Sequence, residues 1–92
     1  MRLVFTPHGW EDYTHWQRTD KATLKPDRAT LKRLNRLLDD TLRDPFSGIG
    51  KPESLRHVLA GCWSRRIDEE HRLVYQVDGE DLIVLQARYH YS

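Results

Sequence analysis

The sequence predicts an α+β fold in which two helices cover one face of a sheet that contains an antiparallel meander. Two stretches of the first half repeat apolar residues at helical spacing, and the second half alternates apolar and polar residues with the period of a strand. The alternating stretches are separated by turn sequences, of which Asp78-Gly79 is a strong hairpin signal. We therefore expect one strand, two helices and a three-strand antiparallel meander, in that order.

The first half of the chain supplies the opening strand and both helices. Residues 2–6 predict a short strand that ends at Pro7. An aromatic stripe at helical spacing predicts a helix over about residues 9–20, with the stripe in the core; its members are Trp10, Tyr13 and Trp16. A leucine face predicts a second helix that stops before Pro45; its members are Leu31, Leu34, Leu37, Leu38 and Leu42. Residues 21–30 are expected to be a surface connection or a lengthened helix end.

An arginine-rich hairpin organises the second half. Residues 63–67 and 71–77 alternate as two strands joined by an acidic turn, and Arg65, Arg66 and Arg72 occupy strand positions. A guanidinium on a rigid strand is a planar donor fork that suits phosphate. We expect these arginines to form a cationic surface on the sheet face opposite the helices. The last strand is predicted over residues 82–89, because it opens with the continuous apolar run of a covered central strand.

Length and composition restrict the class of protein. A chain of 92 residues predicts one domain, residues 1–92. The net charge is only +1, so any site for a polyanion must be a local cluster. The single cysteine, Cys62, excludes an internal disulfide and predicts a reducing, cytoplasmic environment. The opening apolar run is too short for a signal peptide or a membrane span, so no membrane partner is expected.

Several kinds of site are disfavoured by spacing. The candidate metal ligands follow no CxxC or HExxH pattern; they are Cys62, His57, His71 and His90. The chain has no G-x-S-x-G elbow and no dinucleotide fingerprint. The stretch Gly48-Ile49-Gly50-Lys51 is not a P-loop, because Pro52 stands where Ser or Thr is needed. We therefore expect neither a metal nor a cofactor.

A carboxylate, an arginine and a histidine remain, and these suffice for metal-independent RNA cleavage. A base takes the proton of the ribose 2′-hydroxyl, a cation stabilises the pentacoordinate phosphate, and an acid protonates the leaving 5′-oxygen. Such a site leaves a 2′,3′-cyclic or 3′-phosphate and a 5′-hydroxyl.

Four sequence blocks resemble the YoeB (Txe/YoeB) toxins of the RelE superfamily. They are Lys51-Pro52-Glu53-x-Leu55, Trp63-Ser64-Arg65-Arg66-Ile67, Glu69-Glu70-His71-Arg72-Leu73-Val74-Tyr75 and Arg88-Tyr89-His90-Tyr91. The opening Trp10-x-Asp12-Tyr13-x-x-Trp16-Gln17 block also matches, so the resemblance covers nearly the whole chain. Residues 21–30 depart from the pattern by being about seven residues longer, and Ser92 follows the tyrosine at which family chains commonly stop.

The resemblance implies a RelE-like fold and the toxin of a type II toxin–antitoxin system. Such a toxin is a ribosome-dependent mRNA interferase that cuts mRNA in the A site and inhibits translation. Carried over by motif, Glu53 is the general base, Arg72 the phosphate-stabilising cation and His90 the general acid, and Tyr91 orients the nucleotide. The implied RNA-binding residues are Lys51, Arg56, Arg65 and Arg66.

The implied partners are the ribosome, mRNA and a cognate antitoxin. A surface formed by Arg65, Arg66 and Arg72 suits the acidic, disordered C-terminal segment of a YefM-like antitoxin. The resemblance also leaves open a homodimer.

A second interpretation is a non-catalytic module that binds RNA or an acidic peptide through the same arginines. In it, Arg72 pairs with Glu69 or Glu70, Glu53 is a surface carboxylate and His90 is an exposed residue near the end of the chain. The joint presence of Glu53, Arg72 and His90 favours the enzyme, because a pure RNA binder gains nothing from a carboxylate in its phosphate site.

Overall fold

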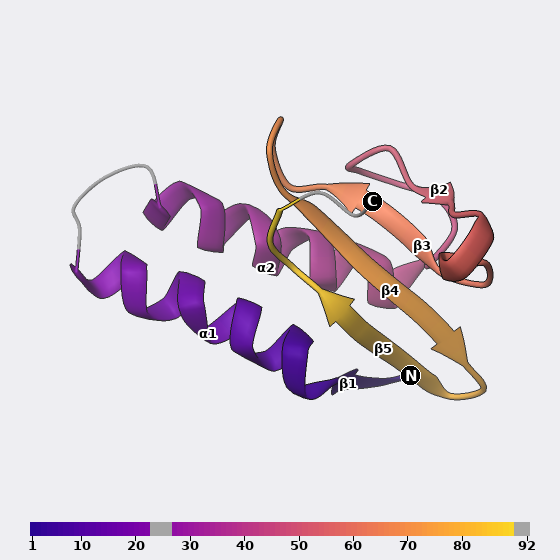
Figure 1. Cartoon of the computed structure of the whole chain (residues 1–92). Helices are drawn as coiled ribbons and strands as arrows, with labels where there is room; N and C mark the ends of the chain where they lie inside the picture. The colour runs from indigo at the N-terminus through magenta and orange to yellow at the C-terminus, as the bar shows by residue number, and fades with distance from the viewer. Residues whose placement is uncertain (23–26, 90–92) are drawn as a thin grey trace.

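The computed structural model describes the backbone of residues 1–22 and 27–89, and the side chains of residues 1–19 and 29–89. Two helices pack on one face of a sheet (Figure 1), as the sequence predicts. The elements are β1 (Arg2–Phe5), α1 (Pro7–Ala22), α2 (Asp27–Arg43), β2 (Glu53–Ser54), the short 3-10 helix η1 (His57–Leu59), β3 (Trp63–Arg66), β4 (Arg72–Asp78) and β5 (Asp81–Gln86).

The sheet has five strands in the order β1-β5-β4-β3-β2. Its centre is the predicted meander of β3, β4 and β5, and the β4–β5 hairpin turns at Gly79-Glu80 as the Asp78-Gly79 signal indicates. Strand β1 pairs in parallel with β5, and β2 extends the far edge by an antiparallel pairing with β3. Strand β2 was not predicted, because two residues are too few to show a period.

Helix α1 begins two residues earlier than the aromatic spacing predicts. The Thr6 hydroxyl accepts a hydrogen bond from the backbone N–H of Gly9 at 3.0 Å, and Pro7 occupies the first helical position, where its missing N–H costs nothing. The predicted aromatic core is correct for Trp16, which is buried, and wrong for Trp10, which is 52% exposed. Trp10 instead lies at the rim, with its ring edge-on to Phe5.

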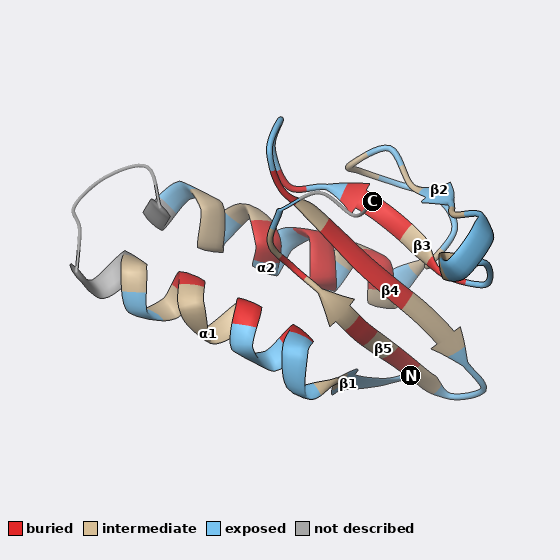
Figure 2. Cartoon of the chain, viewed as in Figure 1, coloured by how far each residue is buried: buried red, intermediate tan, exposed pale blue. Residues whose placement is uncertain are grey.

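Helix α2 buries its leucine face against the sheet and ends before Pro45, as predicted. Figure 2 shows the buried positions gathered on α2 and the central strands, whereas η1 and the loop around β2 are exposed. Of the segment expected to be a connection or a helix end, residues 21–22 and 27–30 are helical; residues 23–26 lie outside the described part.

The expectation that Arg65 belongs to an exposed cationic surface is wrong. Its side chain is 0% exposed and faces the helices, on the same side of β3 as Trp63 and Ile67, which pack with the core. Its guanidinium is satisfied internally: Nη1 lies 2.7 Å from Asp40 Oδ2, and Nε donates to the Tyr75 hydroxyl at 3.2 Å. The remaining acceptors are the backbone carbonyls of Asp44, Ser47 and Ile49.

Arg65 thereby fixes the loop that leads from α2 to β2. The loop passes so close to the core that a Cβ on Gly50 would lie 2.7 Å from Leu37 Cδ2, and Gly50 has a φ of 82° that favours glycine. The Tyr75 hydroxyl adds a 2.6 Å hydrogen bond to the Pro45 carbonyl. The loop is therefore fastened at several points just before it delivers Glu53 to the sheet edge.

We predict an acid-sensitive contribution of Asp40 to stability. The pKa of Asp40 is lowered from 3.8 to about 2, chiefly by the hydrogen bond from the Ile49 N–H and then by Arg43 and Arg65. A lowered folded-state pKa stabilises the protein above pH 3.8 and stops doing so as the pH falls toward about 2. Asp40→Asn should therefore lower the urea midpoint at pH 7, and its gap from wild type should narrow over that acid range. Asp39→Asn, at the exposed neighbouring position, is the control; a gap independent of pH would contradict the prediction.

Candidate active site

The strand register places Glu53, Arg66 and Arg72 on one face of the sheet. Glu53 is opposite Ser64, and Arg66 is opposite Arg72. Directly opposed residues of antiparallel strands share a face, as do alternate residues along one strand. Because Arg65 points toward the helices, these three side chains lie on the opposite face, which we call the open face.

The spacing on the open face leaves room for a phosphate. Strands β2 and β4 flank β3, so their axes are about 10 Å apart. Glu53 and Arg72 can therefore reach toward a common ligand from two sides. Two like charges directly opposite each other destabilise a sheet, so the cross-strand pair of Arg66 and Arg72 is better explained as an anion-binding site than as a stabilising feature.

Arg72 is held by backbone carbonyls and not by the acidic side chains of the turn. Its Nη1 donates to the carbonyl oxygens of Asp68 at 2.7 Å and His71 at 3.1 Å, with a longer bond to that of Glu69 at 3.4 Å. Within the described part of the chain, the side-chain hydrogen bonds of Arg72 all come from Nη1, and Nε and Nη2 form none there. Arg72, Glu69 and Glu70 are all described, and no ion pair joins Arg72 to either glutamate. The interpretation in which Arg72 only pairs with one of them is therefore not supported.

The sequence of the turn explains why its backbone carbonyls are positioned to accept hydrogen bonds from Arg72. The carboxylate Oδ1 of Asp68 accepts the backbone N–H groups of Glu70 at 2.8 Å and His71 at 2.7 Å, which is the hydrogen bonding of an Asx turn. These two hydrogen bonds brace the backbone of the turn whose carbonyls accept from Arg72. Preorganisation of this kind is what stabilises charge that develops in a transition state.

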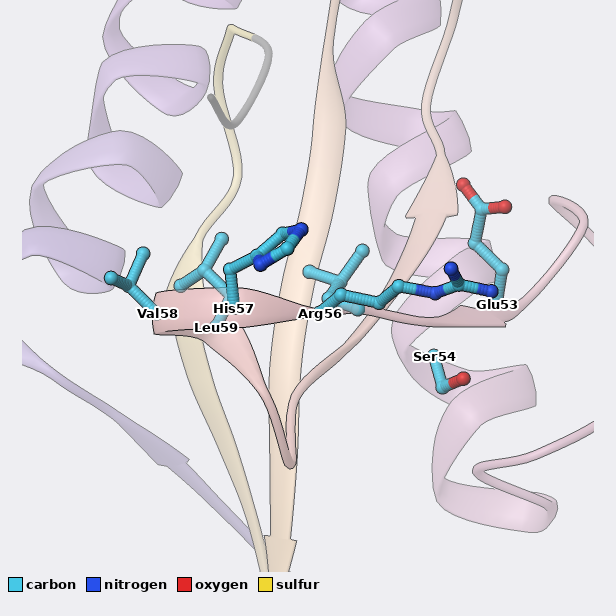
Figure 3. A pocket seen from close by; sticks show the side chains of 7 residues that line it. Glu53, Ser54, Arg56, His57, Val58 and Leu59 are labelled. Atoms are coloured by element: carbon cyan, nitrogen blue, oxygen red, sulfur yellow. The ribbon is translucent and has the colours of Figure 1, made fainter.

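A shallow pocket of about 380 Å³ lies beside Glu53. Its lining is contributed by residues 53–59, which comprise β2, η1 and the connection between them. Figure 3 shows the side chain of Arg56 extending toward the end of the pocket where Glu53 lies, so a carboxylate and a cation line the same pocket. Both residues are exposed, as contact with a large substrate requires.

Backbone strain marks the same region. The non-glycine residues with positive φ in the described part of the chain are Lys51 at 53°, His57 at 60° and Tyr89 at 64°. Each belongs to a segment that borders the open face: Lys51 precedes Glu53, His57 lines the pocket, and Tyr89 is hydrogen-bonded to Arg72. Strained residues of this type concentrate at functional sites, because only a well-packed surrounding can maintain them.

The last strand is shorter than predicted. It ends at Gln86 and not at residue 89, after which the chain leaves the regular sheet. The predicted acid His90, the predicted orienting residue Tyr91, and Ser92 lie outside the described residues. Tyr89, which precedes them in the sequence, is held next to Arg72 by a 3.0 Å backbone hydrogen bond.

Three further polar contacts at this end of the sheet were not predicted from the sequence. Asp12, Trp16 and His71 hydrogen-bond to the backbone of Ala87 and Tyr89. A signal for His71 was present, because it alternates in register with Leu73 and Tyr75 and so shares their buried face. No such signal exists for Asp12, whose partner lies 75 positions away.

Two further observations concern metals and membranes. Among residues 1–19 and 29–89, no three or more His, Cys, Asp or Glu side chains gather as a metal site would require. Neither helix, so far as it is described, has the length and apolarity to cross a membrane.

Comparison with known proteins decides the family. The model of the YoeB-like toxin of bacterial type II toxin–antitoxin systems matches residues 5–91. This chain belongs to that family. Toxin YoeB of Streptomyces coelicolor is 55% identical over 91 residues, covering 99% of this chain and 100% of that protein.

Solved structures agree with this family assignment. A YoeB/ParE toxin from Agrobacterium tumefaciens is 46% identical with a TM-score of 0.88, over 99% of this chain and 100% of that one. YoeB from Staphylococcus aureus, solved as a YoeB–YefM complex and as a dimer, is 39% and 40% identical, each with a TM-score of 0.82 over 99% of this chain and 98% of that one. The fold and the family predicted from sequence are therefore confirmed.

We predict opposite consequences for the two adjacent arginines. Arg65→Ala removes one of several donors to Asp40 and leaves three buried carbonyls without this donor, and buried polar groups left unsatisfied cost about 1–3 kcal/mol each, enough together to threaten folding. Arg66→Ala removes an exposed side chain and should change stability by no more than about 0.5 kcal/mol. Thermal unfolding followed by circular dichroism compares the two, and equal losses of stability would refute the assignment of Arg65 to the interior.

Proposed function

We propose that this chain is a ribosome-dependent endoribonuclease that cleaves mRNA in the A site without a metal ion. The observation that supports this most is the shared open face, on which the register brings a carboxylate, Glu53, to the same side of the sheet as Arg66 and Arg72. A site that only bound phosphate would be weakened by that carboxylate, whereas a nuclease needs a base close to its phosphate site.

In the proposed reaction, Glu53 takes the proton of the ribose 2′-hydroxyl. The 2′-oxygen attacks the adjacent phosphorus, and the bond from phosphorus to the 5′-oxygen breaks. Arg72 stabilises the added negative charge of the pentacoordinate phosphate, and His90 gives a proton to the departing 5′-oxygen. The products are a 2′,3′-cyclic phosphate and a 5′-hydroxyl, and Tyr91 orients the nucleotide.

The remaining cations bind the RNA backbone in this proposal. Arg66 stands directly opposite Arg72, and Arg56 borders the pocket beside Glu53. Lys51 lies just before Glu53 in the chain. All three are exposed. Arg65 takes no part, because its donors are engaged inside the protein; its role is to fix the loop that carries Lys51 and Glu53.

The proposed regulator is an antitoxin of YefM type. The related YoeB from S. aureus was solved with YefM. The open face of this chain presents Arg66 and Arg72, so we expect an acidic, disordered C-terminal segment to fold over them and exclude RNA. A homodimer is a further proposed assembly, since the S. aureus protein was also solved as a dimer.

The activity can be tested by primer extension on a message, with and without translating ribosomes. Wild type should give cleavage only with ribosomes, and saturating antitoxin should suppress it. Arg72→Lys keeps the charge but loses the planar fork, so its single-turnover rate should fall by about 10²–10³-fold. Absence of cleavage by wild type would support a non-catalytic binding module, and a wild-type rate in Arg72→Lys would make Arg72 a structural residue.

The end of the chain can be tested by truncation. Removing Tyr91 and Ser92 should leave the melting temperature nearly unchanged, because the sheet ends at Gln86. The cleavage rate should fall by about 10²-fold, since a small misplacement of a nucleotide is enough for such a loss. Removing Ser92 alone is the control and should change neither quantity. Unfolding of the longer truncation, or a rate equal to wild type, would remove Tyr91 from the proposed site.

A further inference from the structure

The backbone that follows β5 is held in place by side chains from distant parts of the fold. At Ala87, the N–H donates to Asp12 Oδ2 at 3.0 Å, and the carbonyl accepts from the indole Nε1 of Trp16 at 2.8 Å. Both partners come from α1. Helix α1 therefore engages both polar groups of Ala87 at the point where the sheet no longer does.

Tyr89 is held in the same manner from the other side. Its N–H donates to Nδ1 of His71 at 2.7 Å, and its carbonyl accepts from the Arg72 N–H at 3.0 Å and from Gln86 Nε2 at 3.2 Å. The φ of Tyr89 is 64°, a left-handed conformation that a tyrosine rarely adopts without such support.

Asp12, Trp16 and His71 form one cluster, which we call the terminal clamp. Their exposed fractions are only 6%, 4% and 8%, and the Trp16 and His71 rings meet edge to face with centroids 4.8 Å apart. His8 Nε2 lies 3.4 Å from the Asp12 carboxylate, and Glu70 Oε1 lies 3.7 Å from His71 Nε2. Burying a carboxylate and an imidazole is costly unless they form hydrogen bonds, and the bonds that they form go to residues 87 and 89.

The part of the clamp that holds Tyr89 does little to build the core. The Tyr89 side chain is 52% exposed, so fixing its backbone buries little apolar surface. Ordering a chain end costs conformational entropy, and here burial does not compensate for it. The compensation comes instead from the hydrogen bonds to the Tyr89 backbone, which fix this residue next to Arg72.

We propose that the terminal clamp positions the end of the chain for catalysis, with His71 as the decisive positioning residue. The unprotonated Nδ1 of His71 accepts the Tyr89 N–H, which fixes the residue before His90 beside the phosphate-binding Arg72. This rests on the proposed nuclease function. In the neutral ring the hydrogen is then on Nε2, so the feature that matters is an acceptor at the δ position.

Two substitutions at His71 distinguish the loss of the hydrogen-bond acceptor from a change in side-chain size. Asparagine offers Oδ1 where histidine has Nδ1, whereas leucine fills similar space without any acceptor. With ribosome-bound message, His71→Leu should lose about 10²-fold in single-turnover rate at unchanged ribosome affinity, because a misplaced catalytic group loses rate and not binding. His71→Asn should recover most of that rate. The amide of Tyr89, followed by hydrogen exchange, should lose protection in His71→Leu and keep it in His71→Asn.

A matched control excludes a general loss of stability. Leu82→Val removes a buried methylene at the start of β5, the end of that strand opposite to the clamp, so it destabilises the fold without touching the clamp or the loop before Glu53. When each protein is assayed the same number of degrees below its own melting temperature, this variant should cleave at the wild-type rate. Trp16→Phe, which keeps an aromatic ring but removes the donor to Ala87, is the second clamp variant if His71→Leu does not fold, and it should lose rate as His71→Leu does.

The proposal is overturned if His71→Leu and Trp16→Phe cleave at the wild-type rate. It also fails if His71→Asn is as slow as His71→Leu, or if Leu82→Val is equally impaired. If wild type itself does not cleave, the nuclease function fails and the catalytic part of this proposal with it. Protection of the Tyr89 amide then decides alone whether His71 fixes the chain end.

Discussion

The buried guanidinium of Arg65 is the interaction on which the rest of the site depends. A fully buried charge is tolerated only when it is paired and its donors are satisfied, and here one carboxylate, one hydroxyl and three carbonyls do so. Those acceptors belong to α2, to β4 and to the loop between α2 and β2. One side chain thus connects the helix layer to the sheet and fixes the path of the chain toward Glu53.

The two faces of β3 consequently carry arginines with opposite tasks. Arg65 donates its hydrogen bonds to acceptors inside the protein, whereas Arg66 lies on the open face opposite Arg72. A small protein with a net charge of +1 can create a strongly cationic spot in this way without becoming basic overall. Local placement on a rigid sheet, and not total charge, determines where a polyanion is attracted.

Segments far apart in the sequence support the open face. Strand β2 brings Glu53 to the far edge by pairing with β3, and α1 supplies Asp12 and Trp16 to hold the backbone after β5. Such side-chain hydrogen bonds substitute for the ladder that ends at Gln86. The result is a sheet on which β2, β3 and β4 bring Glu53, Arg66 and Arg72 to one face, while α1 holds the backbone after β5.

The sequence by itself determined the two helices, the central meander and the family, because these depend on local periodicity and on contiguous blocks of residues. The alternation of Arg65 with Trp63 and Ile67 also indicated that its side chain faces the core. An arginine nevertheless suggested a surface role, and the structure shows that the side chain is buried. Only the tertiary structure decided the pairing of the two-residue strand β2, the early end of β5 and the hydrogen bonds of His71 and Asp12 to the chain end. The physical reason is that these features depend on contacts between residues far apart in the chain, which leave no period and no motif in the sequence.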